Sequence, residues 1–223
     1  MGQTSLEQIL EWRGQSSAAA ALDLFKEPKK KETQLYFEGN LDLIKKPSIA
    51  IIGSREVGRQ HLETARTITA DLVQADLVIV SGLAKGIDAT AHRSAIEHGG
   101  STIAVIGTPL DVVYPAAHRE LQREIADYHL VVSQFASGTK TYPSNFPRRN
   151  KVMAAVSSAS LVIQAAEGSG TLHQLDECKR LKRPILIFEQ IIADGHLWTQ
   201  KYLQLPFTHV VSSGKDIARA LNV

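Results

Sequence analysis

The feature that most constrains the fold of this chain is a series of short apolar runs that end in glycine or serine. The first run is Ile49–Ile52, which leads directly into Gly53, Ser54 and Arg55. An unbroken apolar run bounded by a turn signal is typical of a strand buried on both faces of a parallel sheet. The stretch that follows, 59–74, has apolar residues at helical spacing and therefore predicts a helix packed on that sheet.

The same alternation recurs along the chain. Further strands are predicted at 77–80, 102–106, 130–132, 161–165, 185–188 and 209–211, and helices at 85–97, 117–128, 148–157, 169–182 and 216–221. Before the first run, the sequence predicts a short edge strand at 35–37 and a helical turn near 41–44. Strands that alternate with helices form right-handed βαβ units, so we expect an α/β fold with a doubly wound, mostly parallel sheet. Ligands of such folds bind at the carboxyl ends of the strands.

Residues 1–32 have a different composition from the rest. Apolar residues within 6–12 and 18–25 predict two short helices, and the basic run Lys26–Lys31 follows them. A run of like charges is typical of a solvated linker, although it also suits a nucleic-acid-binding arm. We therefore expect an N-terminal helical extension with a basic linker at 1–32, and one domain at 33–223. A length of 223 residues is enough for this arrangement.

Composition and motif content exclude several classes of protein. The net charge is only +2, so any nucleic-acid contact requires a local cluster of cations. The single cysteine, Cys178, excludes an intrachain disulfide. With no signal-peptide pattern and no apolar stretch of membrane-spanning length, a cytoplasmic location is expected. The histidines lack carboxylate or thiolate partners at metal-ligand spacing, and the motifs of nucleotide cofactors and of nucleophilic hydrolases are absent, so neither a metal nor a cofactor is predicted.

Small and basic residues gather where the predicted strands end and helices begin. Gly53-Ser54-Arg55, Ser81-Gly82 and Gly168–Thr171 all occupy such positions. Helix N-termini present unpaired N–H groups and a positive dipole end, both of which attract phosphate. Lys85, Arg148, Arg149 and Lys151 oppose that dipole unless an anion lies nearby, whereas Asp88 suits a capping role. We call this edge of the sheet, where the strands end and the helices begin, the rim, and we interpret it as a phosphate-binding site.

Several ordered motifs resemble the DNA-processing protein A (DprA/Smf) family. They are Leu35–Asn40, Ile49–Arg55, Ser81–Asp88 with His92, Gly100–Gly107, Tyr114-Pro115, Phe146–Lys151 and Ser169–Leu172. The resemblance covers about residues 34–190. It implies a Rossmann-like fold that binds single-stranded DNA without catalysing a reaction, loads the RecA recombinase, assists natural transformation and forms a homodimer.

The resemblance and the rim together name the candidate DNA and phosphate contacts. They are Gly53, Ser54, Arg55, Ser81, Gly82, Lys85, Lys140, Arg148, Arg149, Asn150, Lys151, Ser169, Gly170 and Thr171. Binding of single strands also uses aromatic rings on which bases stack. Tyr114, Tyr142 and Phe146 are the candidate platforms, and Phe146 equally suits the core.

The sequence also departs from the family. Residues 191–223 suit one more strand and helix rather than the usual winged helix, the N-terminal region is short, and His118 stands where the family usually has Asn. Two alternatives of the same superfamily stay open. One is a sensor of a small nucleotide. The other resembles the LOG phosphoribohydrolases, but their motif glutamate falls on Gln174, which leaves only Asp176 or Glu177 as a carboxylate.

Overall fold

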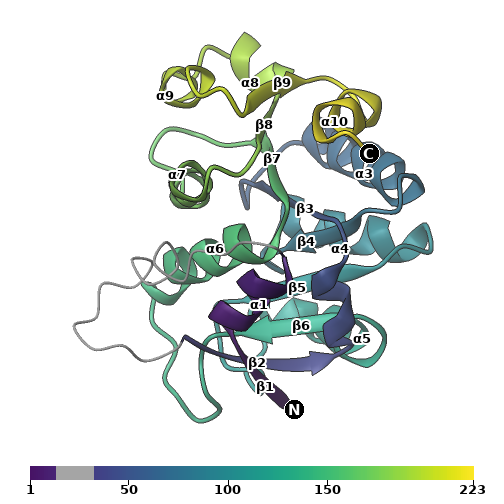
Figure 1. Ribbon diagram of the computed structural model, residues 1–223, viewed down its shortest axis with the longest axis vertical. Coiled ribbons are helices and arrows are strands. Elements are labelled where there is room, and N and C mark those ends of the chain that lie inside the picture. Colours follow the sequence, from purple (N-terminus) through teal and green to yellow (C-terminus); the bar gives the residue numbers. More distant parts are fainter. Residues whose placement is uncertain (14–32) are drawn as a thin grey trace.

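A computed structural model describes residues 1–13 and 33–223, and the predicted helix at 18–25 and basic linker lie outside this part. The sheet has the strand order β1-β2-β6-β5-β4-β3-β7-β8-β9 (Figure 1). The strands are β1 Gly2–Ser5, β2 Gln34–Gly39, β3 Ser48–Gly53, β4 Val78–Ser81, β5 Thr102–Ile106, β6 Leu130–Ser133, β7 Ala159–Gln164, β8 Ile185–Phe188 and β9 Thr208–Val211. The helices are α1 Leu6–Trp12, η1 Leu41–Lys45, α3 Arg59–Gln74, α4 Ile87–Glu97, η2 Ala116–His118, α5 Arg119–Tyr128, α6 Asn145–Val156, α7 Thr171–Leu181, α8 Glu189–Ala193, α9 Thr199–Leu203 and α10 Gly214–Leu221.

The pairing confirms the predicted doubly wound α/β fold. All neighbouring strands from β6 to β9 in the sheet order run parallel, and β2 and β1 add an antiparallel margin. The prediction that 35–37 forms an edge strand is wrong, because β1 pairs with the free side of β2. The residues of β1 (Gly2–Ser5) carry no apolar run, so their local pattern gave no strand signal.

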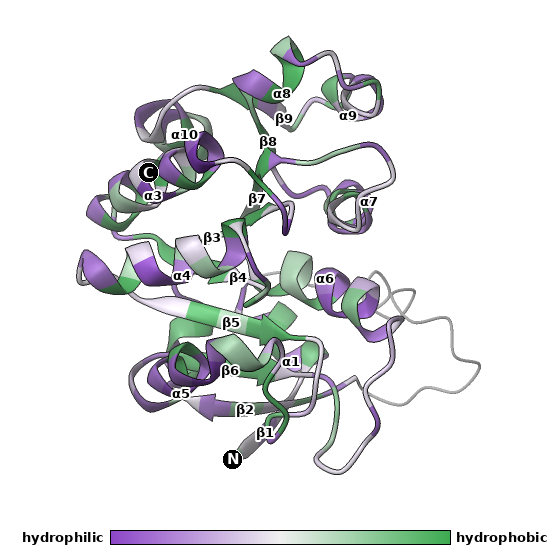
Figure 2. Cartoon of the chain, turned by 180° about the vertical axis from the view of Figure 1, so that it is seen from behind, coloured by the Kyte–Doolittle hydropathy of each residue, from purple (hydrophilic) through white to green (hydrophobic). Residues whose placement is uncertain are grey.

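Side-chain alternation along the central strands divides the core between the two faces of the sheet. In β3, Ile49 and Ile51 contact the cluster beneath α3, α4 and α10, whereas Ala50 and Ile52 contact the cluster beneath α6 and α7. Figures 1 and 2 show these helix layers on opposite sides of the sheet. Because both faces are covered, the central strands are apolar throughout, as the sequence predicted.

The order of the strands positions the functional site. From β3 the chain proceeds outward through β4, β5 and β6, and it then crosses over to β7 on the other side of β3. β3 and β7 therefore flank the point at which the winding direction reverses. The carboxyl ends of two such strands diverge into separate helices, and this leaves a crevice that suits a ligand.

The N-terminal elements pack onto the main sheet. Leu6, Ile9 and Leu10 of α1 are buried in the same cluster as β3 and α6. Arg13, just after α1, donates to the carbonyl oxygen of Ile44 at 2.7 Å and to the hydroxyl of Ser158. Burial lowers the pKa of Arg13 to about 10. The domain boundary at residue 32 stays a prediction, since the residues on its N-terminal side lie largely outside the described part.

Three local details differ from the predicted elements. Helix α6 begins at Asn145 rather than at 148, so Pro147 lies inside its first turn, where its missing N–H costs no helical hydrogen bond. Helices α8 and α9 were not predicted, because five residues are too few to show a helical period.

Among the helices of the described residues, none is both long and apolar enough to cross a membrane.

Candidate functional site

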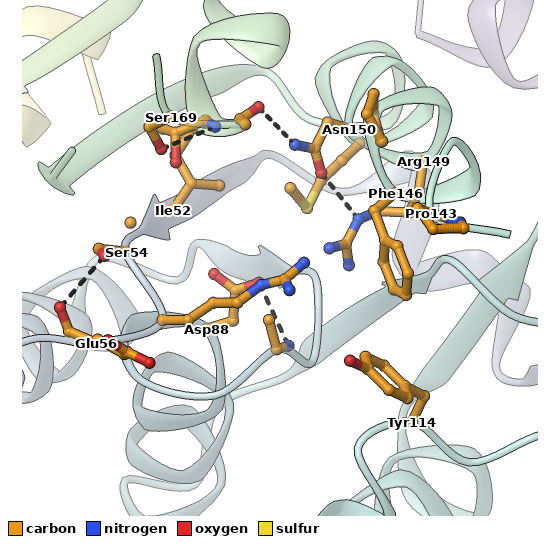
Figure 3. A pocket seen from close by; sticks show the side chains of 17 residues that line it. Ile52, Ser54, Glu56, Asp88, Tyr114, Pro143, Phe146, Arg149, Asn150 and Ser169 are labelled. Atoms are coloured by element: carbon orange, nitrogen blue, oxygen red, sulfur yellow. Dashed lines mark hydrogen bonds between the residues drawn. The ribbon is translucent and has the colours of Figure 1, made fainter. Parts of the chain in front are cut away.

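A pocket of about 610 Å³ lies at the switch point between β3 and β7 (Figure 3). Its walls come from the end of β3, the turn before α4, the loop after β5, the first turn of α6 and the turn before α7. The structure thus brings together candidates from segments far apart in sequence. Those that line the pocket are Gly53, Ser54, Arg55, Arg149, Asn150, Ser169, Gly170 and Thr171.

Two of the candidates lie beneath the pocket rather than on its surface. Ser81 is fully buried, and its hydroxyl donates to the carbonyl oxygen of Ile51 at 2.7 Å. Gly82 is buried, and its carbonyl oxygen accepts from Arg149. The prediction that Ser81 and Gly82 contact a ligand is therefore corrected. Their small size allows the guanidinium of Arg149 to pack against the end of β4. The composition of a strand end does not distinguish this packing role from ligand binding.

Four basic candidates lie outside the pocket lining. Lys85 is exposed in the turn before α4, and Lys140 stands over the ring of Tyr142 at 5.6 Å. The Cζ of Arg148 lies 5.8 Å from the centre of the Phe135 ring. Lys151 follows Asn150 on α6 and is half-buried. These residues could contact a longer ligand that leaves the pocket, but they do not form its walls.

Arg149 is the best-anchored cation of the pocket. Its side chain is only 4% exposed, and its guanidinium donates from Nη1 to the carbonyls of Gly82 and Val105 and from Nε to Oδ1 of Asn150. In the described part of the chain Nη2 has no acceptor, and it is not enclosed by protein. Figure 3 shows the guanidinium extending from α6 into the pocket. Arg149 therefore presents N–H groups in a fixed orientation, as phosphate recognition requires.

Asp88 supplies the buried negative charge near these cations. It lies in the first turn of α4, is 5% exposed and lines the pocket. Burial raises its pKa, and the guanidinium groups of Arg149 and Arg55 act in the opposite direction. Burial likewise lowers the pKa of Arg149, and Asp88 opposes that shift. The predicted capping of α4 takes another form, because the N-cap residue is Gly86 and the carboxylate of Asp88 accepts from the N–H of Ala84, which precedes the helix, at 3.4 Å.

The turn before α7 contributes backbone donors. The hydroxyl of Ser169 accepts from the N–H of Thr171 at 3.2 Å, so it satisfies the first N–H of α7 from the residue before the N-cap, Gly170. The N–H of Gly170 has no acceptor within the described residues, and Gly170 is exposed in the pocket wall. An unpaired amide at a helix N-terminus is a donor suited to an anion. The turn and Arg149 thus line the same pocket.

Two aromatic rings form a further part of the pocket wall. The rings of Tyr114 and Phe146 lie 5.3 Å apart at 47°, and the Cζ of Arg55 lies 5.3 Å from the centre of the Phe146 ring. Tyr114 is 51% exposed and lines the pocket, so part of its ring is accessible to a planar ligand. Tyr142 is also exposed, but it does not line the pocket. Of the three predicted platforms, the structure therefore brings Tyr114 and Phe146 to the site.

Sequence reasoning missed some pocket residues. Glu56 lines the pocket beside Arg55, and Pro143 and Met153 complete the wall formed around α6. The only sequence signal that could have identified Glu56 as a pocket residue is its position next to the candidate Arg55. The position of Met153 in its helix predicts an ordinary core residue, and Met153 is indeed almost fully buried.

The residues that a phosphoribohydrolase would use are elsewhere. Gln174 is fully buried and donates to the hydroxyl of Ser160 at 2.8 Å. Asp176 pairs with Lys201, and Glu177 pairs with Arg180. None of these three lines the pocket, whose carboxylates are Glu56 and Asp88. A search of the described residues finds no cluster of three His, Cys, Asp or Glu side chains that could hold a metal ion.

Comparison with known proteins identifies the family of this chain. Residues 21–222 match the family described as DNA recombination-mediator protein A. DNA processing protein DprA of Streptococcus pneumoniae is 39% identical over 183 residues, which are 82% of this chain and 64% of that protein. Protein Smf of a Synechocystis species is 42% identical over 142 residues, 62% of this chain and 36% of that protein. The chain thus spans about two thirds or less of these relatives.

Solved structures show the same fold. The crystal structure of DprA from S. pneumoniae superposes with a TM-score of 0.76 at 38% identity, over 83% of this chain and 65% of that one. A structure of DNA processing protein A from Helicobacter pylori, reported for its single-stranded DNA binding mode, superposes with a TM-score of 0.75 at 26% identity, over 91% of each chain. A molybdenum cofactor carrier protein from Chlamydomonas reinhardtii, at 15% identity and a TM-score of 0.55, shares the Rossmann-like fold alone. From its sequence and its fold together, the chain belongs to the DNA recombination-mediator protein A family.

Proposed function

We propose that this protein binds single-stranded DNA through the switch-point pocket and acts as a non-catalytic recombination mediator. The observation that carries the proposal is the anchored guanidinium of Arg149, which lines the same pocket as the unpaired N–H of Gly170. These donors suit a phosphate and read no base edge, so the binding they support is tolerant of sequence. The related H. pylori protein, reported to bind single-stranded DNA, supports the choice of ligand.

The aromatic wall supports the same proposal. Tyr114 and Phe146 stand next to Arg55, so a phosphate held by the cations would leave its base near an open ring face. Stacking on aromatic rings together with backbone contacts is the usual way to bind single strands without sequence preference. Lys85, Lys140, Arg148 and Lys151 extend the basic surface outside the pocket and complete the proposed contacts.

A salt titration of oligonucleotide binding tests the proposal. If the pocket holds phosphates, the logarithm of the binding constant falls linearly with the logarithm of salt concentration. Arg55→Ala removes one exposed pocket charge, so the slope should become shallower by about 0.7 and affinity should fall roughly tenfold. The matched control is Arg123→Ala, which removes an exposed arginine of α5 that does not line the pocket. A flat slope for the unmodified protein, or equal losses in both variants, would reject the pocket as the DNA site.

Recombinase loading and dimer formation belong to the same proposal. The family resemblance suggests that the protein places RecA on single strands and acts as a homodimer. A strand-exchange assay with RecA and coated DNA tests the first point, and sedimentation of the purified protein tests the second. Stimulation of exchange that is lost in Arg55→Ala supports loading through the same pocket, whereas stimulation retained in that variant argues against it.

A small nucleotide is the second candidate ligand. The pocket volume of about 610 Å³ lies in the range that encloses a small molecule. Mass spectrometry of ligands that co-purify with the protein distinguishes this candidate from DNA. Incubation with AMP, followed for release of free adenine, tests the hydrolase alternative, and the positions of Gln174 and Asp176 outside the pocket lead us to expect no release.

A further inference from the structure

Asn150 joins Arg149 to the turn before α7 at the pocket wall (Figure 3). Its Oδ1 accepts from Nε of Arg149 at 2.9 Å, and its Nδ2 donates to the carbonyl oxygen of Gly170 at 3.0 Å. Arg149 belongs to α6, whereas Gly170 precedes α7. The side chain of Asn150 thus bridges the N-terminal region of one helix and that of the next.

Only a primary amide of this length completes the bridge. The oxygen must accept from a guanidinium at one end, and the nitrogen must donate to a carbonyl at the other. A carboxylate of the same size would still accept from Arg149, but it would turn an oxygen toward the oxygen of Gly170. An alanine would end both hydrogen bonds. The carboxamide oxygen and one of its N–H groups are therefore engaged with the protein itself.

We propose that Asn150 is a positioning residue, and that it sets the spacing between Nη2 of Arg149 and the N–H of Gly170 so that both donors reach one phosphate. The inference rests on the proposed function of the pocket and revises the role expected for Asn150 from a phosphate contact to a bridge. The geometry explains why a neutral side chain influences an electrostatic interaction. Without the bridge, Arg149 keeps its charge and its hydrogen bonds to Gly82 and Val105, but the turn before α7 is no longer tied to its guanidinium.

The slope of the salt titration separates positioning from direct contact. Asn150→Ala removes no charge, so the loss of a direct neutral contact would weaken binding and leave the slope unchanged. If Asn150 acts through Arg149, one phosphate contact is lost with it. The slope should then become shallower by about 0.7, and affinity at moderate salt should fall about tenfold. Asn40→Ala is the matched control, because it also removes an asparagine that bonds to backbone, at the start of η1 and outside the pocket.

A second measurement uses the protein without DNA. Asn150→Asp keeps the size of the side chain and its contact with Arg149 but loses the bond to Gly170. Amide hydrogen exchange across 168–172 should therefore be faster in this variant than in the unmodified protein, while exchange in the central strands stays the same. Thermal unfolding of all variants confirms that each remains folded.

The outcomes distinguish the inference from the proposed function. An unchanged slope or unchanged affinity in Asn150→Ala, with normal binding by the unmodified protein, would overturn the positioning role alone. Absence of salt-dependent binding in the unmodified protein would overturn the proposed function. In that event the exchange measurement still decides whether Asn150 holds the turn, and unaltered exchange at 168–172 would contradict it.

Discussion

The guanidinium of Arg149 donates to the carbonyl oxygen of Gly82, although the two residues are 67 positions apart in the chain. The hydrogen bond ties the first turns of α6 to the end of β4, directly under the pocket. A Cβ on Gly82 would collide with Nη1 of Arg149 and would lie 2.6 Å from Oδ2 of Asp88. The absence of a side chain at Gly82 is therefore what allows the buried arginine and aspartate to lie where they do.

Gly82→Ala should impair stability and binding together. The added methyl group has no space, so Arg149 must move, and overpacking of this kind costs about 1–3 kcal/mol. Urea unfolding measures the loss in free energy, and a fluorescent oligonucleotide measures the loss in affinity. Gly58→Ala is the control, since a Cβ there meets only one atom, at 4.0 Å. Equal stability of the two variants would show that Arg149 is not held as described.

Gly170→Ala should separate stability from binding. Gly170 has a φ of −57°, which any residue adopts, and a Cβ there meets no atom within 4 Å. Thermal stability should therefore stay the same, or rise by about 0.4–1 kcal/mol because the unfolded chain loses freedom. The methyl group would stand beside the amide that is proposed to hold a phosphate, so oligonucleotide affinity should fall roughly tenfold. Unchanged affinity would remove Gly170 from the proposed contacts.

Stability should fall as the pH is lowered because of His92. This residue is fully buried, its Nδ1 lies 2.7 Å from the hydroxyl of Thr102, and burial lowers its pKa to about 3. The unfolded chain binds the proton near the ordinary value of about 6.5, while the folded protein does not. The stabilisation is therefore present above that value and is lost as the pH falls below it, by about 2 kcal/mol between about pH 7.5 and about pH 5.

Urea unfolding at the two pH values checks this expectation. His92→Gln lacks the titrating ring, so its loss of stability over the same interval should be smaller than that of the unmodified protein by a similar amount. His173→Gln replaces an exposed histidine of α7 and is the matched control. The same pH dependence in all three proteins would assign the acid sensitivity to other groups.

Part of the site could be predicted from the sequence. Gly53, Ser54, Arg55 and Gly170 follow strands whose apolar runs are unmistakable, and the carboxyl ends of parallel strands share one edge of the sheet. The same argument predicted ligand contacts at Ser81 and Gly82, which the structure buries outside the pocket lining. The side chain of Arg149 enters from α6 and covers the end of β4, so an identical strand-end composition has a packing role there.

By itself the sequence determined the identity and order of most helices and strands, because hydrophobic periodicity is a local property that each segment carries. It also determined which edge of the sheet gathers small and basic residues. Only the tertiary structure decided which of those residues face the pocket, that Asp88 balances Arg149, and that Asn150 bridges α6 and the turn before α7. These relationships depend on the strand order β4-β3-β7 and on contacts between distant segments, and no local pattern encodes the distance between two side chains that meet only when the sheet has formed.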